Sequence, residues 1–382
     1  MKKLLLTTAA ILALASPALA NNGVSTINQT GAANTANVDQ NDPDVTAASS
    51  TITQSGNNNM STLTQRGDSS VGAGDLVSRI VQSGNGNAAT VSQDITTFAV
   101  NGFSDVTQSG NLNVANITQI DDWQSVTLVQ SSNGNLANVK QGDAALAVGD
   151  DSFGNDATIN QGGTGSHIAN VNQTSLNAAL NLTQNGFDNE ALVNQGFNLL
   201  GSEDHIATIS QIGSSSYVLV EQRGVTAEGH NASISQNASL SEARVYQTGG
   251  NNQQGDITQN ANNSFAVILQ TAGDTNLASI TQNAGTGGYA GIEQNADNID
   301  ADITQTGSGH FARGRQDGID NDFDITQTGT NNRADIRQNG NTNQLSVNQS
   351  GMGNTANVTQ NTNANNLTVT QPGNNNSTTI TQ

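Results

Sequence analysis

Thirty glutamines recur along this 382-residue chain at regular spacings. They form fifteen pairs, whose members are 11 residues apart in thirteen pairs and 12 apart in the other two. The gaps between pairs vary from 11 to 20 residues. A fixed spacing within a unit and a variable one between units is typical of a repeat architecture with loops of unequal length. The sequence therefore predicts fifteen units, whose first glutamines are Gln29, Gln54, Gln82, Gln108, Gln130, Gln161, Gln184, Gln211, Gln236, Gln259, Gln282, Gln305, Gln327, Gln349 and Gln371.

Similar side chains recur at every second position before each glutamine, as in Asn34, Ala36, Val38 and Gln40 of the first unit. Isoleucine, valine or leucine lies two residues before the glutamine in 29 of the 30 cases, and Gly314 is the exception. Alanine lies four residues before the second glutamine in twelve of the fifteen units. Because a period of two is strand geometry, these side chains share one face. We expect that face to be buried in a thin core between two closely apposed sheets.

A short connector of the form Gln-x-Gly-x-x-Asn joins the two strands of a unit, as from Gln29 to Asn34. Its glycine is present in eleven of the fifteen units, and glycine and asparagine suit the positive φ angles of tight turns. One unit cannot bury enough surface alone, so units must stack, with backbone pairing at about 4.7 Å between layers. We therefore expect an all-β fold: a β-solenoid of about fifteen strand–turn–strand repeats, with two strands per layer and cross-β stacking.

Glutamines and asparagines at repeated positions are expected to stack on their equivalents and to hydrogen-bond from amide to amide along the axis. A buried amide without such a partner would be costly. The residues predicted to form these structural ladders are Gln29, Asn34, Gln40, Gln54, Asn59, Gln65, Gln82, Asn87, Gln93, Gln108, Asn113, Gln119, Gln130, Asn135, Gln141, Gln184, Asn189, Gln195, Gln327, Asn332, Gln338, Gln349, Asn354, Gln360, Gln371, Asn376 and Gln382.

The two ends of the ladder favour a polymer. Gln382 closes the fifteenth unit, and Gln29 lies only eight residues after Asn21, so neither end leaves sequence for a capping helix. A solenoid that stays monomeric generally needs capped terminal layers, and open strand edges pair with other chains. We expect head-to-tail homopolymerisation. Because every interval from Gln294 to Gln382 is 11 residues, we expect the C-terminal third to form the most regular and seed-competent ladder.

Residues 1–20 read as a secretory signal peptide, with Lys2 and Lys3 at its start, an apolar stretch, and a cleavage site after Ala20. The repeat domain would then span residues 21–382 and be secreted. The whole chain has a formal net charge of −20, which excludes a nucleic-acid partner and disfavours anionic membranes. It contains no cysteine, so disulfides do not stabilise it, and we expect no membrane-embedded segment.

No residue pattern indicates an enzyme, a cofactor site or a metal site. The histidines fall in different units without ligand spacing: His167, His205, His230 and His310. The acidic segment 317–324 is compatible with calcium, but the strand pattern directs its aspartates to solvent. Arg66-Gly67-Asp68 matches a cell-adhesion tripeptide, which occurs easily by chance, and Trp123 is expected on the solvent side of a loop. We therefore expect no catalytic role.

The motif aliphatic-x-Gln-x-Gly-x-x-Asn-x-Ala-x-x-x-Gln, seen from Ile27 to Gln40 and from Val106 to Gln119, resembles the curlin repeat of the curli fibre subunits. The resemblance covers essentially the whole chain after residue 20. It implies a functional amyloid exported through a dedicated outer-membrane pore, assembled with a nucleator protein, and located in extracellular fibres at the bacterial cell surface. Such fibres build biofilm matrix and mediate cell aggregation and adhesion. The alternative is a monomeric or surface-anchored solenoid adhesin that binds through its enlarged inter-unit loops.

Overall fold

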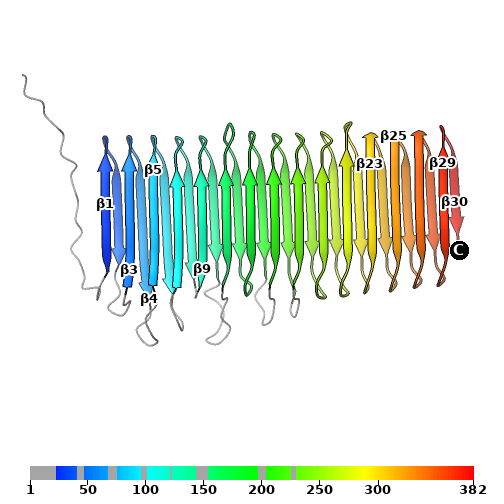
Figure 1. Cartoon of the computed structure of the whole chain (residues 1–382), viewed down its shortest axis with the longest axis horizontal. Helices are drawn as coiled ribbons and strands as arrows, with labels where there is room; N and C mark the ends of the chain where they lie inside the picture. Colours follow the sequence, from blue (N-terminus) through cyan, green and yellow to red (C-terminus); the bar gives the residue numbers. More distant parts are fainter. Residues whose placement is uncertain are drawn as a thin grey trace, which may run out of the picture.

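The computed structural model describes residues 23–40, 47–67, 75–95, 101–120, 123–142, 154–196, 204–224 and 229–382. Within these residues the chain forms a straight β-solenoid, with strands perpendicular to its long axis (Figure 1). The proposed signal segment with Ala20, and Asp68 of the Arg66-Gly67-Asp68 match, lie outside the described residues. In the described part there is no helix long and apolar enough to cross a membrane.

The first strands of the fifteen units form one parallel sheet, here sheet A. Its strands, in spatial order, are β1 (Val24–Thr30), β3 (Ala47–Ser55), β5 (Asp75–Ser83), β7 (Asn101–Gln108), β9 (Gln124–Gln130), β11 (Asp156–Gln161), β13 (Ala179–Gln184), β15 (Ile206–Gln211), β17 (Asn231–Gln236), β19 (Gln254–Gln259), β21 (Leu277–Asn283), β23 (Asp300–Ser308), β25 (Asp322–Thr330), β27 (Gln344–Met352) and β29 (Asn366–Pro372).

The second strands form the opposing parallel sheet, here sheet B, and each pair of strands makes one layer, numbered 1 to 15. Its strands are β2 (Thr35–Gln40), β4 (Met60–Gly67), β6 (Ala88–Ile95), β8 (Val114–Ile120), β10 (Leu136–Gln141), β12 (Ile168–Gln173), β14 (Glu190–Gln195), β16 (Tyr217–Gln222), β18 (Glu242–Gln247), β20 (Phe265–Gln270), β22 (Tyr289–Gln294), β24 (Phe311–Gln316), β26 (Arg333–Gln338), β28 (Thr355–Gln360) and β30 (Ser377–Thr381).

Stacking between layers is in register, so equivalent residues of successive units lie side by side. Gln29 pairs with Gln54 in sheet A, and Gln40 pairs with Gln65 in sheet B. The strands alternate buried and exposed residues, as the period-two pattern predicted. The all-β solenoid fold with two strands per layer is thereby confirmed.

The core is a continuous apolar column between the two sheets. In the inner layers, the isoleucine, valine and leucine residues two positions before the glutamines are buried, and with the inward alanines they form one cluster. Phe323 is the one aromatic residue in that cluster, and its side chain is fully buried. The thinness of the core follows from this choice of small and medium side chains.

The connectors between paired strands stack as closely as the strands do. A Cβ added at Gly31, whose φ is 103°, would lie 1.8 Å from the carbonyl oxygen of Gly56 in the next layer. Glycine is therefore required by the close approach of successive backbones as well as by the turn. The residue just before the connector asparagine also has positive φ, for example Ala33 at 56° and Asn58 at 57°.

Candidate assembly surface: amide ladders and end layers

The glutamines of sheet A form a continuous hydrogen-bonded ladder. The Nε2 of each glutamine donates to the Oε1 of its equivalent in the next layer, from Gln29 to Gln371, at 2.6–3.0 Å. Sheet B carries a second ladder from Gln40 to Gln382, at 2.7–3.3 Å. Amides buried between two sheets thus satisfy one another.

Each buried glutamine also ties the two sheets together. The Nε2 of Gln108 in sheet A donates to the carbonyl oxygen of Ala88 in sheet B at 3.1 Å. In the opposite direction, Gln119 of sheet B donates to the carbonyl of Phe103 in sheet A at 2.9 Å. The amide nitrogen therefore uses one hydrogen along the axis and one across the layer. A shorter side chain such as asparagine would not make both bonds, which explains the choice of glutamine at this position.

The connector asparagines form a third ladder, in which side chains bind backbone. The Oδ1 of Asn34 accepts from the backbone N–H of Asn59 at 3.0 Å, and Asn59 does the same for Asn87 at 3.0 Å. The Nδ2 of Asn59 donates to the connector carbonyl of Ser55 and to that of Gly84 in the next layer. This arrangement fixes the turn conformation from layer to layer.

Two histidines take the place of asparagine in this connector ladder. The Nδ1 of His167 accepts from the backbone N–H of Asn189 at 3.3 Å, and the Nδ1 of His310 accepts from Asn332 at 3.3 Å. The Nε2 of His167 lies 2.7 Å from the carbonyl oxygen of Gly162. These contacts require a neutral ring with its proton on Nε2. Burial lowers the pKa of both histidines, which favours that neutral form.

The other two histidines meet in the connector that joins one layer to the next. His205 and His230 lie in layers 8 and 9, their rings stack at 4.9 Å between centroids, and both are fully buried. Burial, with the neighbouring ring, lowers the pKa of His205 to about 3, and burial lowers that of His230 to about 4. The sequence pattern indicated only that the histidines fall in different units. Both lie six residues before the first glutamine of their units, so counting from Gln211 and Gln236 would have placed them together.

The acidic segment 317–324 has the orientation that the strand pattern predicted. Asn321 and Phe323 are buried, whereas Asp324 is exposed and Asp322 half-buried on the outer side of sheet A, and Asp320 is exposed in the turn before β25. Burial, followed by neighbouring carboxylates, raises the pKa of Asp324 and of Asp302, which pairs with it in the adjacent strand. Among the described residues no group of three or more His, Asp or Glu side chains could hold a metal ion.

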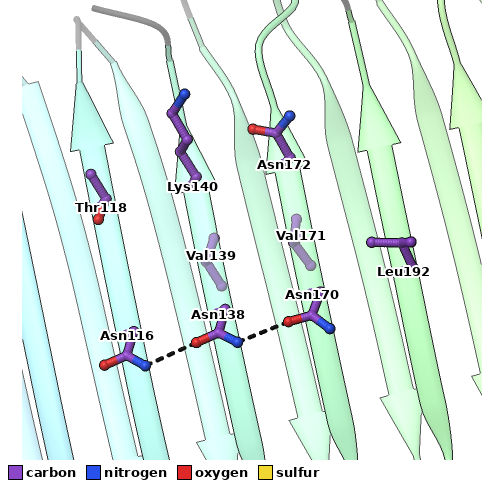
Figure 2. Close-up of a pocket in the computed structure, with 9 residues that line it drawn as sticks. All are labelled: Asn116, Thr118, Asn138, Val139, Lys140, Asn170, Val171, Asn172 and Leu192. Carbon is purple, nitrogen blue, oxygen red and sulfur yellow. Dashed lines mark hydrogen bonds between the residues drawn. The ribbon is translucent and has the colours of Figure 1, made fainter.

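A shallow hollow of about 240 Å³ lies on the outer face of sheet B in layers 4 to 7. Figure 2 shows a row of asparagines across it, in which Asn116 donates to Asn138 at 2.9 Å and Asn138 donates to Asn170 at 2.8 Å. Leu192 continues the row in layer 7, so the amide bonding stops there. This row of surface asparagines is hydrogen-bonded from layer to layer in the same way as the internal ladders.

Trp123, in a loop of layer 5, is 55% exposed, as expected for a residue on the solvent side.

The first and last layers differ from the interior in burial. Ile27 and Val38 in layer 1, and Leu367 and Ile380 in layer 15, are only partly buried, whereas their equivalents in inner layers are fully buried. Each of these end strands pairs with one strand among the described residues. The ladders are also polar, because every glutamine donates toward the C-terminal side. In the described residues, the ladder oxygens of layer 1 therefore have no glutamine donor and the ladder nitrogens of layer 15 have no glutamine acceptor.

Comparison with known protein families matches a model described as the curlin associated repeat at residues 296–329 and again at 329–361. Both matches fall in the stretch where the glutamine interval is constant, in layers 12 to 14. A search of curated proteins finds no match. The family match supports the resemblance stated from the sequence, and it shows that residues 296–361 carry curlin associated repeats.

Proposed function

We propose that this chain, which carries curlin associated repeats, is a secreted structural subunit that assembles head to tail into extracellular amyloid fibres. Such fibres would serve biofilm matrix, cell aggregation and surface adhesion. The role is structural, and the proposal assigns no catalysis. Export would use residues 1–20 with cleavage after Ala20, an outer-membrane pore and a nucleator partner. The repeat domain would be residues 21–382.

The polarity of the glutamine ladders is the observation that carries the proposal. Along the ladders of the described chain, Gln371 and Gln382 in layer 15 accept from layer 14 and have no glutamine acceptor for their own nitrogens, whereas Gln29 and Gln40 in layer 1 donate to layer 2 and have no glutamine donor for their oxygens. Gln371 Nε2 also donates to the carbonyl of Thr355 and to Thr378 Oγ1, and Gln40 Oε1 accepts from Ser25 Oγ. Donors of one copy therefore face acceptors of the next only when copies stack head to tail. A head-to-head contact would oppose like groups and leave buried amides unpaired, which is costly.

The apolar residues of the end layers match in the same arrangement. Continuing the in-register stack places Val369 over Ile27 and Ile380 over Val38 of the next copy. Each junction would cover the partly buried residues of both end layers and extend the core without a break. A heterologous contact that repeats along one axis generates an open filament.

The experiment is seeded polymerisation followed by amyloid-dye fluorescence. Preformed fibres are expected to remove the lag phase, because each fibre end templates the next layer. Ile380→Lys is expected to stop elongation, since the junction would bury an unpaired charge. Thr379→Lys is the matched control, because Thr379 is exposed and outward in the same strand and should polymerise normally. Persistent soluble monomer with no response to seeds would reject the proposal and favour the solenoid adhesin.

A further inference from the structure

Strand β20 of layer 10 is apolar on both sides. Its inward residues Ala266 and Ile268 are buried in the core, and its outward residues Phe265, Val267 and Leu269 are all large and apolar. In no other strand of the described chain are all three outward residues large and apolar. A strand with a continuous hydrophobic run is typical of a sheet that is covered on both faces. The outer face of β20 is only half-buried.

Neighbouring layers extend this apolar surface along the outer face of sheet B. The rings of Phe265 and Tyr289 stack at 5.5 Å between centroids, and those of Tyr289 and Phe311 at 4.9 Å. All three tyrosines of the chain lie on this face. We name the following residues of layers 8 to 12 the aromatic belt: Tyr217, Leu219, Tyr246, Phe265, Val267, Leu269, Tyr289 and Phe311. Tyrosine- and phenylalanine-rich surfaces edged by charge are typical of protein interfaces.

The charges beside the belt differ between its two ends. On the N-terminal side, Glu190 in layer 7 and Glu221 in layer 8 point outward from sheet B. On the C-terminal side, Arg315 in layer 12 and Arg333 in layer 13 occupy the equivalent positions in their strands. With their neighbours included (Arg223 in layer 8, and Arg313, Asp317, Asp335 and Arg337 in layers 12 and 13), the face has a net negative charge at one end and a net positive charge at the other, with apolar β20 between them.

We propose that the aromatic belt is the lateral docking surface for a second copy of this chain, packed antiparallel about a two-fold axis that passes through β20 along the strand direction. Layer 8 of one copy then opposes layer 12 of the other, and β20 opposes itself. Tyr217 faces Phe311, and Glu221 faces Arg315. In the same way Glu190 in layer 7 faces Arg333 in layer 13. The surface is therefore complementary to itself, as a two-fold interface requires.

A parallel arrangement of the two copies lacks this complementarity. It would oppose each layer to its own equivalent with the strand direction reversed, so Arg333 would approach Arg337 of the other copy and the outward Arg313 would approach its own equivalent. Like charges in contact disfavour an interface. Glu221 and Arg315 already have partners in their own copy, since Arg223 lies 3.0 Å from Glu221 and Asp317 lies 2.8 Å from Arg315. These half-exposed ion pairs contribute little to stability, so Glu221 and Arg315 can each form a second ion pair with the oppositely charged residue of the other copy.

The area of the proposed interface can be compared with the areas of known protein interfaces. Layers 7 to 13 present roughly 650 Å² of face per copy at the usual strand and layer spacings, or about 1,300 Å² for the pair. That total lies at the lower end of specific interfaces, so single copies would pair weakly. In a filament each copy contributes one belt, and the repeated contacts would act together. Lateral pairing does not require head-to-tail assembly, so the two proposals can fail separately.

Cysteine cross-linking tests the geometry, because the chain has no cysteine of its own. In the full chain, Val267→Cys is expected to cross-link to itself through a short bismaleimide, since residue 267 lies on the two-fold axis. Tyr217→Cys and Phe311→Cys are expected to cross-link when mixed, whereas each alone stays monomeric. Thr258→Cys in β19 is the control, because it lies in the same layer on the opposite face. Failure of Val267→Cys to cross-link, or self-cross-linking of Tyr217→Cys, would overturn the proposal.

A charge exchange tests the predicted facing of Glu221 and Arg315, with the Val267→Cys cross-link as the readout. Glu221→Arg and Arg315→Glu are each expected to lower the cross-linked yield at Val267→Cys at least about tenfold, because both oppose like charges at two sites per pair. Mixing the two variants restores unlike charges at both sites and should restore the yield. Unchanged yields would contradict the antiparallel arrangement. If the protein binds a polysaccharide matrix through the aromatic belt and the cysteine variants do not cross-link, the belt is a sugar-binding surface and the proposed docking of a second copy is refuted.

Discussion

Gly314 is the one position before a ladder glutamine that lacks an aliphatic side chain, and Phe323 explains it. A Cβ added at Gly314 would lie 1.9 Å from the tip of the Phe323 ring, which reaches across from sheet A in the next layer. Phe323 occupies a position that alanine fills in the neighbouring strand β23, at Ala301. The large residue in one sheet therefore takes the space that a small residue leaves in the other.

This reciprocity predicts the energies of three variants. Phe323→Ala removes a fully buried ring and is expected to cost about 4 kcal/mol. Gly314→Ile alone would force its side chain into the ring and is expected to cost about 3 kcal/mol. The double variant restores the usual Ile–Ala arrangement of other layers and is expected to lie within about 1.5 kcal/mol of the natural protein. The coupling energy would then exceed about 3 kcal/mol in favour of the double variant.

Hydrogen exchange resolved to layers 12 and 13 is the appropriate assay, because stability in a solenoid is local to neighbouring layers. Each single variant should increase exchange in β23 to β26, and the double variant should return it close to the natural rate. Exchange in layers 2 to 4 serves as the internal control and should not change. Additive losses in the double variant would refute the proposed fit between Phe323 and Gly314.

Three further results are expected. His205 and His230 have folded pKa values below the ordinary 6.5, so the stability that their neutral forms contribute is present above pH 6.5 and is lost as pH falls. Exchange in layers 8 and 9 should reveal a loss of about 3 kcal/mol between pH 6.5 and 5, and this loss should be absent from a variant with asparagine at both positions. Asp302 and Asp324 have raised pKa values, so layers 12 and 13 should become more stable as pH falls toward 4. Asp302→Asn should remove part of this pH dependence of hydrogen exchange in the same layers. A pH profile that the substitution leaves unchanged would contradict the prediction. Gln236→Ala orphans an amide on each side and should cost about 2–5 kcal/mol by thermal unfolding, whereas Ser235→Ala on the outer face should cost under about 0.5 kcal/mol.

The repeat made the fold predictable from the sequence. Counting back from each glutamine assigns every strand residue to a face, because strands alternate with period two. In-register stacking then places equivalents side by side, as for Gln29 and Gln54. The same count also fixes the connector position of Asn34, whose side chain binds the next layer.

Contacts between unlike residues were harder to foresee. Phe323 meets Gly314 across the two sheets and between layers, so the strand pattern of either unit alone does not reveal the pair. The stacking of His205 on His230, by contrast, follows from counting back from Gln211 and Gln236, because loops of unequal length return both residues to one column. The aromatic belt arises from outward residues of five layers, whereas the repeat constrains only the inward ones. The contact of Phe323 with Gly314 and the aromatic belt required the assembled solenoid.

Electron cryomicroscopy of filaments grown from the full chain tests head-to-tail assembly most directly. Head-to-tail assembly predicts one uninterrupted stack with layers about 4.7 Å apart, in which the layer of Gln371 lies next to the layer of Gln29 of the following copy and the amide ladder crosses the junction. Separate rods of roughly 70 Å that never join at any concentration, or filaments whose glutamine ladders stop at each junction, would contradict it.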